Sequence, residues 1–276
     1  MEIKSYKPQN PALRDRIECF YTLRRAPDDK ACKYLTFPSV FSMVCLNAKA
    51  QTELEENNLR IICSPENPLE STLICDFENP VWVQYEGAAD EIVIYFKPLG
   101  LSAFLEKDLR HYSRSPFARF DPFADYKARM TEIFAVADDQ ARIRALEDYW
   151  LSKFKGFSHP FLYEVIDEIT GAGGASSISR IALKYGVSRT TINKHFDLHL
   201  CTTPSQFKKV FRFRNAMRRH RLKISAESLA DISCQADYFD QSHMIKDFKS
   251  LTNYSPKTFF SKISALEDGQ INWLFL

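Results

Sequence analysis

The sequence lacks the features by which secreted and membrane proteins are usually recognised. Its 276 residues contain no uninterrupted apolar run near the roughly 20 residues that a membrane-spanning helix needs. The seven cysteines form no Cys-x-x-Cys pair, their number is odd, and no secretory leader is apparent. We therefore expect reduced thiols, no membrane partner and a cytoplasmic location.

Histidine is missing from a large part of the chain, since none occurs before His111. Enzymes built on metal-holding barrels use a cluster of histidines, so this absence argues against an enzyme in the N-terminal half. Further on, His195 and His199 stand at i and i+4, a spacing that can bind a metal. Only Asp197 and Cys201 lie close enough in sequence to add ligands, and they do not complete a ligand set. The sequence therefore predicts no catalytic residue, no metal and no cofactor.

The formal net charge of +2 conceals two halves of opposite sign. Residues 171–276 carry 16 Lys and Arg against 8 Asp and Glu, whereas residues 1–170 carry 21 against 27. A basic half joined to an acidic half is typical of a DNA-binding domain attached to a sensing domain. Residues 175–223 hold 12 basic residues and one acid, while residues 225–262 hold four and five. The positive field therefore belongs to the first part of the basic half.

Two stretches of the basic half, 181–204 and 232–256, repeat one pattern. Each begins with a short apolar helix, turns, continues in a second helix that ends in Phe, and then runs to Pro. The two Phe residues, Phe196 and Phe248, are 52 positions apart, as are the two prolines. Such a repeat predicts a tandem helix-turn-helix, whose second helices are shaped to enter the major groove of DNA.

Capping residues mark where the repeated helices begin. Ser188 and Asp240 are placed to cap the two second helices. Thr203-Pro204-Ser205-Gln206 forms a capping box with Pro at the first helical position, and Ser255-Pro256 repeats the start. The first of these predicts a long linker helix from about Pro204 to Leu222. About 19 residues at roughly 1.5 Å each give about 28 Å, close to the roughly 34 Å between successive major-groove faces.

Basic residues surround much of this linker helix, and we expect several of them to reach phosphate. Others are expected to face solvent or to contact the acidic half. Lys208 and Arg212 are the phosphate contacts that we select. The complete basic set is Lys208, Lys209, Arg212, Arg214, Arg218, Arg219, Arg221 and Lys223. Together with the charge count, this set predicts that the first unit and the linker helix supply most of the affinity for DNA.

Base readers are expected on the faces opposite the apolar anchors of the two second helices. Ile192 with Phe196 anchors the first helix, and Met244 with Phe248 anchors the second. Asn suits the edge of adenine, Lys suits guanine, and an exposed Ile can touch only a thymine methyl group. The candidate DNA-contacting set is Arg189, Thr190, Thr191, Asn193 and Lys194 in the first unit, and Gln241, Ser242, Ile245 and Lys246 in the second.

These residues also carry a family resemblance. LADISCQADYFDQSHMIKDFKSLTNYSPKTFF at 229–260 resembles the C-terminal signature of AraC/XylS-type bacterial transcription regulators, and SRIALKYGVSRTTINKHFDLHLCTTPSQF at 179–207 resembles the first helix-turn-helix of that family. The resemblance covers roughly the last 115 residues and implies a seven-helix DNA-binding domain. The family usually has glycine where this chain has Cys201, Asp237 and Asn253. Asn and Asp tolerate a left-handed backbone, whereas Cys201 is not expected to adopt one cheaply.

The first 115 residues show alternation in place of a helical period. Short β-branched or aromatic runs separated by turn residues predict a compact antiparallel sandwich or barrel, with strands at 41–46, 59–63, 72–77, 81–85 and 92–96. Helical spacing follows at 97–109, where YFKPLGLSAFL resembles the end of the effector-side domain in some of the same regulators. Four aromatic residues are candidates for lining a pocket or for the core: Trp82, Tyr85, Tyr95 and Phe96.

The predicted organisation has three parts. Residues 1–115 form a β-rich regulatory domain, residues 116–157 form a helical connector that can also serve as a dimer seam, and residues 158–276 form the AraC-type domain. Its helix-turn-helix units are expected at about 178–200 and 228–252. The apolar tail at 271–276 is left open between docking on the N-terminal domain, on a second subunit or on its own helices.

The sequence as a whole predicts an α+β transcription regulator without enzymatic activity that binds double-stranded DNA through two adjacent major-groove segments. A small-molecule effector at the N-terminal domain is expected to control it. The alternative is a regulator that binds no ligand and is controlled by a protein partner. RNA polymerase and a second copy of the chain are further partners that this prediction allows.

Overall fold

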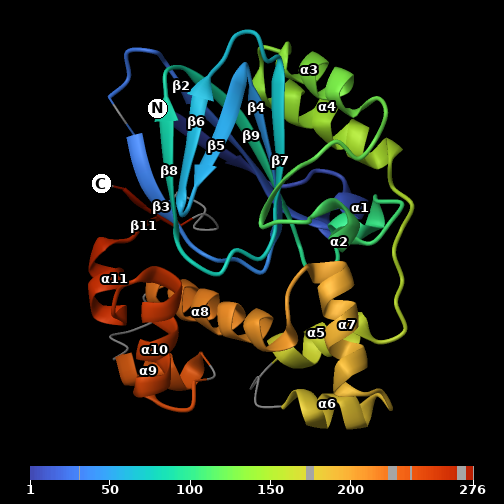
Figure 1. Cartoon of the computed structure of the whole chain (residues 1–276), viewed down its shortest axis with the longest axis vertical. Coiled ribbons are helices and arrows are strands. Elements are labelled where there is room, and N and C mark those ends of the chain that lie inside the picture. The colour runs from blue at the N-terminus through green and yellow to red at the C-terminus, as the bar shows by residue number, and fades with distance from the viewer. Residues whose placement is uncertain (31, 172–176, 223–228, 237, 266–271, 276) are drawn as a thin grey trace.

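The computed structural model describes residues 1–30, 32–171, 177–222, 229–236, 238–265 and 272–275. A β-rich N-terminal part stands above a helical C-terminal part in Figure 1. The α+β organisation expected from the sequence is thereby confirmed. No helix among the described residues is both long and apolar enough to span a membrane.

The N-terminal part contains two six-stranded sheets that enclose a common core. The first runs in the order β1 (Glu2–Tyr6), β2 (Ile17–Arg25), β9 (Ala89–Phe96), β4 (Ser42–Ala48), β7 (Leu69–Ile74) and β10 (Phe117–Arg119). The second runs in the order β11 (Ser264–Ala265), β12 (Asn272–Phe275), β3 (Cys32–Thr36), β8 (Val81–Glu86), β6 (Asn58–Cys63) and β5 (Ala50–Glu55). The predicted strands correspond to β4, β6, β7, β8 and β9.

One pair of strands departs from the antiparallel prediction. Strands β6 and β8 pair in parallel, with Leu59 opposite Val83. Between them the chain crosses to the first sheet as β7 and returns, and a crossover of this kind is what a parallel pair requires. Strands β1, β2, β3 and β5 were not predicted, because their apolar alternation is interrupted by charged residues such as Lys4, Arg24 and Lys33.

Successive side chains of a strand point to opposite faces of the sheet, so the first sheet contributes to two cores. From β9, Glu91, Val93 and Tyr95 point between the sheets, whereas Ile92 and Ile94 point to the outer face of the first sheet. Two helices cover that outer face, α3 (Tyr126–Phe134) and α4 (Asp139–Ser152).

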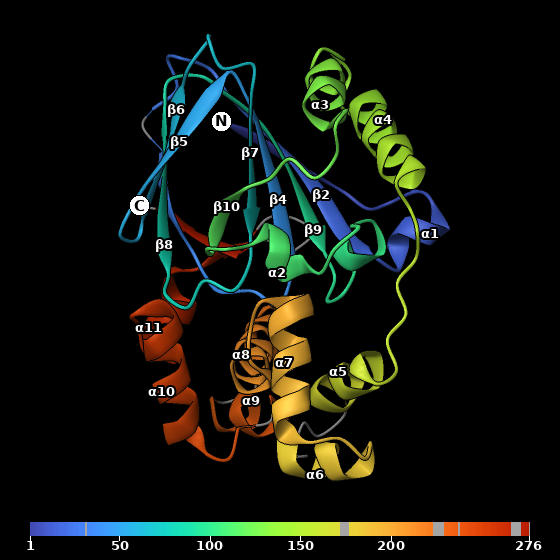
Figure 2. The ribbon, with the colours of Figure 1, turned by 45° about the vertical axis from the view of Figure 1, so that its right-hand side comes forward.

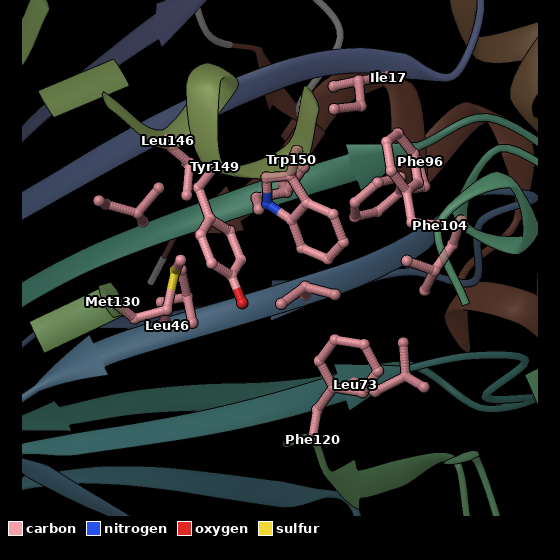
Figure 3. Packing of buried hydrophobic residues seen from close by; sticks show 14 of the residues in the cluster. Ile17, Leu46, Leu73, Phe96, Phe104, Phe120, Met130, Leu146, Tyr149 and Trp150 are labelled. Carbon is pink, nitrogen blue, oxygen red and sulfur yellow. The ribbon is translucent and has the colours of Figure 1, made fainter. Parts of the chain in front are cut away.

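Figure 3 shows Leu146, Tyr149 and Trp150 of α4 above side chains of the strands. The Trp150 ring lies 5.1 Å from that of Phe96, edge to face, and is fully buried. The apolar face that could have formed a dimer seam is therefore used to cover the sheet. A homodimer stays a prediction.

The helix expected at 97–109 is reduced to a single 3-10 turn, η1 (Leu101–Ala103), and is followed by the short α2 (Leu109–Tyr112). Leu99 adopts a left-handed backbone with φ of 63°. A side chain at Gly100 would place its Cβ 2.1 Å from the carbonyl oxygen of Arg16. Close approach to the segment around Arg16 therefore overrides the helical spacing.

Seven helices follow within the described residues, as the sequence predicted. They are α5 (Leu162–Thr170), α6 (Ile178–Lys184), α7 (Arg189–Leu200), α8 (Pro204–Leu222), α9 (Leu229–Gln235), α10 (Gln241–Thr252) and α11 (Pro256–Lys262). Helices α6 and α7 form the first unit, and α9 and α10 form the second. In Figure 2, α7 and α10 lie on either side of α8.

The C-terminal tail returns to the N-terminal part. The backbone of β12 pairs antiparallel with β3, with Leu274 opposite Leu35 and Phe275 opposite Tyr34. In Figure 1 this final strand lies behind and beside β3. Of the three sites left open for the tail, the chain therefore uses its own N-terminal sheet.

Candidate DNA-binding interface and barrel cavity

The second helix of the first unit is built as the sequence predicted. The Ser188 side chain caps α7 by accepting a hydrogen bond from the Thr191 backbone N–H at 3.0 Å. Ile192 and Phe196 are fully buried. The candidate readers on the opposite side are exposed at Arg189, Thr190, Asn193 and Lys194, whereas Thr191 is half-buried. The structure therefore leaves four of the five candidates facing solvent on one helix.

The corresponding helix of the second unit has the same construction. Asp240 caps α10 by accepting from the His243 backbone N–H at 2.7 Å. Met244 and Phe248 are buried. All four candidate readers are exposed: Gln241, Ser242, Ile245 and Lys246. Each unit thus presents a row of polar side chains on a capped helix that would fit a major groove.

The turn after each of these helices has a left-handed residue, as in the glycine-containing pattern of the family. Asn253 has φ of 65°, as expected, and Cys201 has φ of 59°. Cys201 therefore adopts the left-handed backbone that was expected to be costly for it. Burial of its side chain beside Cys75 and a hydrogen bond from Arg110 to its carbonyl oxygen hold the strained turn in place. Asp237 lies outside the described residues.

Arg212, selected as a phosphate contact, is already engaged within the domain. Its guanidinium donates to the Asp247 carboxylate at 3.0 Å and lies over the Tyr238 ring, and both members of the ion pair are largely buried. The same guanidinium lies 3.2 Å from His243 Nε2. Arg212 therefore joins α8 to the recognition helix α10.

The other basic residues of α8 differ in their surroundings. Lys208 and Lys209 are half-buried, and Lys209 donates to the Ser250 hydroxyl at 2.7 Å. Arg214 is half-buried and donates to the carbonyl oxygens of Phe37 and Pro38, which belong to the N-terminal part. Burial lowers the pKa of Arg214 to about 10, so the side chain stays charged at neutral pH. Lys223 lies outside the described residues.

A second polar contact joins the N-terminal part to the first unit. Arg110 of α2 pairs with Asp197 of α7 and donates to the Cys201 carbonyl oxygen at 2.8 Å. The thiols of Cys75 and Cys201 also meet at this contact. The pKa of Cys201 is lowered by the hydrogen bond with Cys75 and then by the nearby Arg110 guanidinium.

An apolar contact joins the N-terminal part to the second unit. Leu35 and Phe37 lie in the same buried cluster as residues of α8, α9, α10 and α11. The Phe37 ring is 4.9 Å from Phe259 and 6.3 Å from Phe213, edge to face in both cases. The core of the second unit is therefore completed by a side chain from the N-terminal part.

Among the described residues, one group of three histidines could hold a metal: His159, His195 and His199. His159, which sequence reasoning missed as a neighbour, accepts at Nδ1 from the Leu162 backbone N–H at 3.3 Å. Its ring proton then belongs on Nε2, which lies 3.0 Å from His195 Nδ1 and donates to it. Burial and the other two histidines lower the pKa of His159 to about 4. This arrangement favours a neutral cap at the start of α5 over a metal centre, and the absence of a metal stays a prediction.

A cavity lies between the two sheets of the N-terminal part. Of the four aromatic residues proposed for a pocket, Tyr95 lines it, while Tyr85 lies behind it and donates to the Glu91 carboxylate at 2.6 Å. Trp82 packs toward the C-terminal helices and Phe96 packs under α4. Glu91 also lines the cavity and was not predicted to do so, although its alternation with Val93 and Tyr95 along the strand was visible in the sequence.

Two capped recognition helices joined by a long helix define this chain as a tandem helix-turn-helix, DNA-binding protein. Residues 181–262 match a family model described as a helix-turn-helix domain, which is of the AraC type. Residues 181–262 thus form a helix-turn-helix domain of the AraC type, the kind of domain that binds DNA. No curated protein matches the chain in sequence.

Solved structures of ToxT from Vibrio cholerae are similar to this chain. A structure of the P21 form is 9% identical, covers 95% of this chain and 98% of its own, and has a TM-score of 0.44. Wild-type ToxT of strain SCE256 with bound unsaturated fatty acid is 12% identical, covers 87% and 93%, and has a TM-score of 0.45. At these values neither a ligand nor a mechanism carries over from ToxT to this chain.

Proposed function

We propose that this protein reads two adjacent major-groove segments with α7 and α10 and that a small molecule in the barrel cavity controls this reading. The exposed rows on the two helices are the base readers, and Lys194 is the principal one. Helix α8, at about 28 Å for 19 residues, sets their separation. Because basic residues concentrate in residues 175–223, the first unit supplies most of the affinity.

The observation that supports control by a ligand is the alternation of side chains along β3. Tyr34 and Thr36 line the cavity. Leu35 and Phe37, which alternate with them, belong to the core of the second unit. A ligand that displaces Tyr34 or Thr36 would therefore move the side chains against which α8 and α11 pack.

A second feature strengthens this connection. Arg214 of α8 donates to the carbonyl oxygens of Phe37 and Pro38, so the backbone just after β3 is fastened to the linker helix. Because Arg214 is half-buried and charged, losing these acceptors would be costly, and the two elements would move together. The linker helix in turn sets the relative position of α7 and α10.

The two-reader proposal is tested by selecting bound DNA from a random pool with the full chain. Two conserved half-sites about one helical turn apart are expected. Lys194→Ala should change the selected base at one position, whereas Lys208→Ala should weaken binding to every sequence and lower the salt dependence. A single half-site, or the same uniform loss for both variants, would contradict the proposal.

Control through β3 is tested by Phe37→Ala. This variant should keep binding any ligand of the cavity, because Phe37 points away from it, but should lose the effect of that ligand on DNA affinity. Control by a protein partner is the alternative, and it would be favoured if occupying the cavity left DNA affinity unchanged in the unaltered chain.

A further inference from the structure

Two deeply buried polar side chains, a carboxylate and an amide, face the barrel cavity among apolar, aromatic and hydroxyl-bearing side chains. Glu91 and Asn47 both line the cavity and are each only 2% exposed. Burying a carboxylate or an amide is costly unless hydrogen bonds compensate for the lost water. Their partners therefore indicate what the cavity is built to hold.

The partners of these two groups are incomplete. Glu91 accepts from the Tyr21 hydroxyl at 2.8 Å and from the Tyr85 hydroxyl at 2.6 Å. A carboxylate has about four acceptor positions, so capacity remains. The side-chain oxygen of Asn47 is buried and has no hydrogen-bond partner among the described residues. An unpaired acceptor of this kind calls for a donor that the protein does not supply.

The cavity also lacks a positive charge of its own. Among the described residues that line it there is no Lys, Arg or His. Arg214 acts on Tyr95 electrostatically, but its guanidinium donates to the carbonyl oxygens of Phe37 and Pro38. An anionic ligand would face Glu91 without a counter-charge, whereas a cation would pair with it.

Aromatic rings complete the environment for a cation. Tyr21, Tyr34 and Tyr95 line the cavity, and the Tyr21 and Tyr95 rings lie 6.0 Å apart. The faces of tyrosine rings attract cations, and the attraction grows when water is excluded. The remaining lining includes Met43, Ile61 and Val93, which suit an apolar body.

We propose that the cavity binds a small protonated amine with an apolar body. Its ammonium N–H groups donate to the Glu91 carboxylate and to the Asn47 side-chain oxygen, and its apolar body packs against Met43, Ile61 and Val93. This inference rests on the proposed function only for its regulatory meaning, because binding itself can be measured without DNA.

The size of the cavity restricts the amine. The cavity has a volume of about 40 Å³, counted as the space open to the centres of water molecules. One water needs about 10–15 Å³ on this measure, so the space suits a molecule of a few heavy atoms. A long acyl chain would require the sheets to separate.

Protonation of Glu91 gives the proposal a pH signature. Burial raises the pKa of Glu91 to about 6, against the opposing hydrogen bonds from Tyr85 and Tyr21. The other titratable groups that face it are Tyr34, Tyr95 and the Cys45 thiol, and burial raises the pKa of each. Of these cavity groups, only Glu91 therefore titrates between pH 5 and 7, and the amine should bind about tenfold more weakly at pH 5 than at pH 7.

The test uses three probes of matched shape on the full chain: isobutylamine, isobutanol and isobutyrate. Binding is measured by calorimetry and by thermal shift at pH 5 and 7. Isobutylamine should bind most tightly and should be the only probe whose affinity rises with pH. Tetramethylammonium, a cation without N–H groups, should bind more weakly because it cannot donate hydrogen bonds to Asn47 and Glu91.

Two variants locate the site. Glu91→Gln and Asn47→Leu should each weaken isobutylamine by about tenfold or more. Glu86→Gln is the matched control, since Glu86 pairs with Arg60 at 2.8 Å and does not line the cavity; it removes the same charge and should leave binding unchanged. If Glu91→Gln does not fold, the pH dependence of isobutylamine binding to the unaltered chain tests the role of Glu91 instead.

Several results would overturn the inference: tighter binding of isobutyrate, equal binding of isobutanol, no binding of any amine, or amine affinity that is independent of pH. Failure of the amine site and failure of the proposed function give different results. If isobutylamine binds as described but DNA affinity does not change, the amine site stands and ligand control fails. If selection returns two half-sites and no amine binds, the DNA-binding proposal stands and the amine site fails.

Discussion

The two helix-turn-helix units are fastened to the N-terminal domain by different sets of contacts. The first unit is held at the end of α7 by the polar contacts of Arg110 with Asp197 and with the Cys201 carbonyl oxygen, and Leu99 of the N-terminal domain lies in its buried apolar cluster. The second unit takes Phe37 into its own core, between Phe213 and Phe259. Exposed ion pairs contribute little and exchange readily with water, whereas a buried ring cannot leave without opening a cavity.

From this comparison we expect the first unit to supply most of the affinity for DNA and the second unit to respond to changes in the cavity. The first unit has the positive field, so we expect it to find DNA. The second unit carries four basic and five acidic residues in 225–262 and is joined to the strand that lines the cavity. A change in the cavity would therefore reach the second unit first. Five predictions test this division.

The largest effect is expected from Phe37→Ala. Removing a fully buried ring from the shared core should lower the free energy of unfolding by roughly 3–5 kcal/mol. Urea denaturation measures the loss, and Phe239→Ala, which removes a ring that is 92% exposed, is the matched control. Equal stability of the two variants would show that the second unit does not depend on the N-terminal domain.

Arg212→Ala should come next, because it leaves the buried Asp247 carboxylate without its cation. We expect a loss of about 2–3 kcal/mol in stability. Arg218→Ala, at an exposed position of the same helix, should cost much less. The salt slope of DNA binding should stay unchanged in Arg212→Ala and fall by about one in Lys208→Ala. An equal fall of the salt slope in both variants would show that Arg212 also contacts phosphate.

Glu91→Gln should alter how stability depends on pH. The folded protein raises the pKa of Glu91 from 4.5 to about 6, so it favours the protonated form. The contribution of Glu91 is fully present below about pH 4.5 and is lost as the pH rises through 6. Relative to Glu91→Gln, the unaltered chain should lose on the order of 2 kcal/mol between pH 4.5 and 7. A difference that does not vary with pH would contradict the burial argument.

Lys194→Ala and Lys246→Ala compare the two readers directly. We expect Lys194→Ala to cost roughly 1–2 kcal/mol of DNA binding with a changed base preference, and Lys246→Ala to cost less. Titration of both variants against the selected site at one salt concentration gives the comparison. A larger loss for Lys246→Ala would reverse the assigned division of affinity.

The smallest effect is expected from Arg110→Ala. Its side chain is 36% exposed and that of Asp197 is 54% exposed, so stability should fall by less than about 1 kcal/mol. Hydrogen exchange at the end of α7 should nevertheless become faster. Lys107→Ala, one turn away on the exposed surface, serves as the control. Unchanged exchange would mean that this contact does not hold the first unit.

Local signals in the sequence were sufficient for the C-terminal helices. Ser188, Asp240 and Ser255 all act as caps in the structure, and α8 begins and ends at the predicted residues. Capping and helical periodicity involve residues three or four positions apart, so the sequence records them directly. The exposed faces of α7 and α10 followed from the same period.

Other features depended on residues far apart in the chain. The parallel pairing of β6 with β8, the short turn in place of a helix after Lys97, and the inward position of Phe37 each require knowledge of a distant partner. The ion pair of Arg212 with Asp247 was not predicted because Asp247 lies on another helix, and the contact of Arg212 with phosphate stays a prediction. His159 was overlooked beside His195 for the same reason.

The sequence by itself determined that this chain carries two helix-turn-helix units of unequal charge on capped helices, because capping, helical period and charge are properties of neighbouring residues. The tertiary structure alone decided that β12 closes on β3, that Phe37 completes the core of the second unit, and that Glu91 and Asn47 face one cavity. Those outcomes depend on which surfaces exclude water together, and that is settled only when distant segments pack.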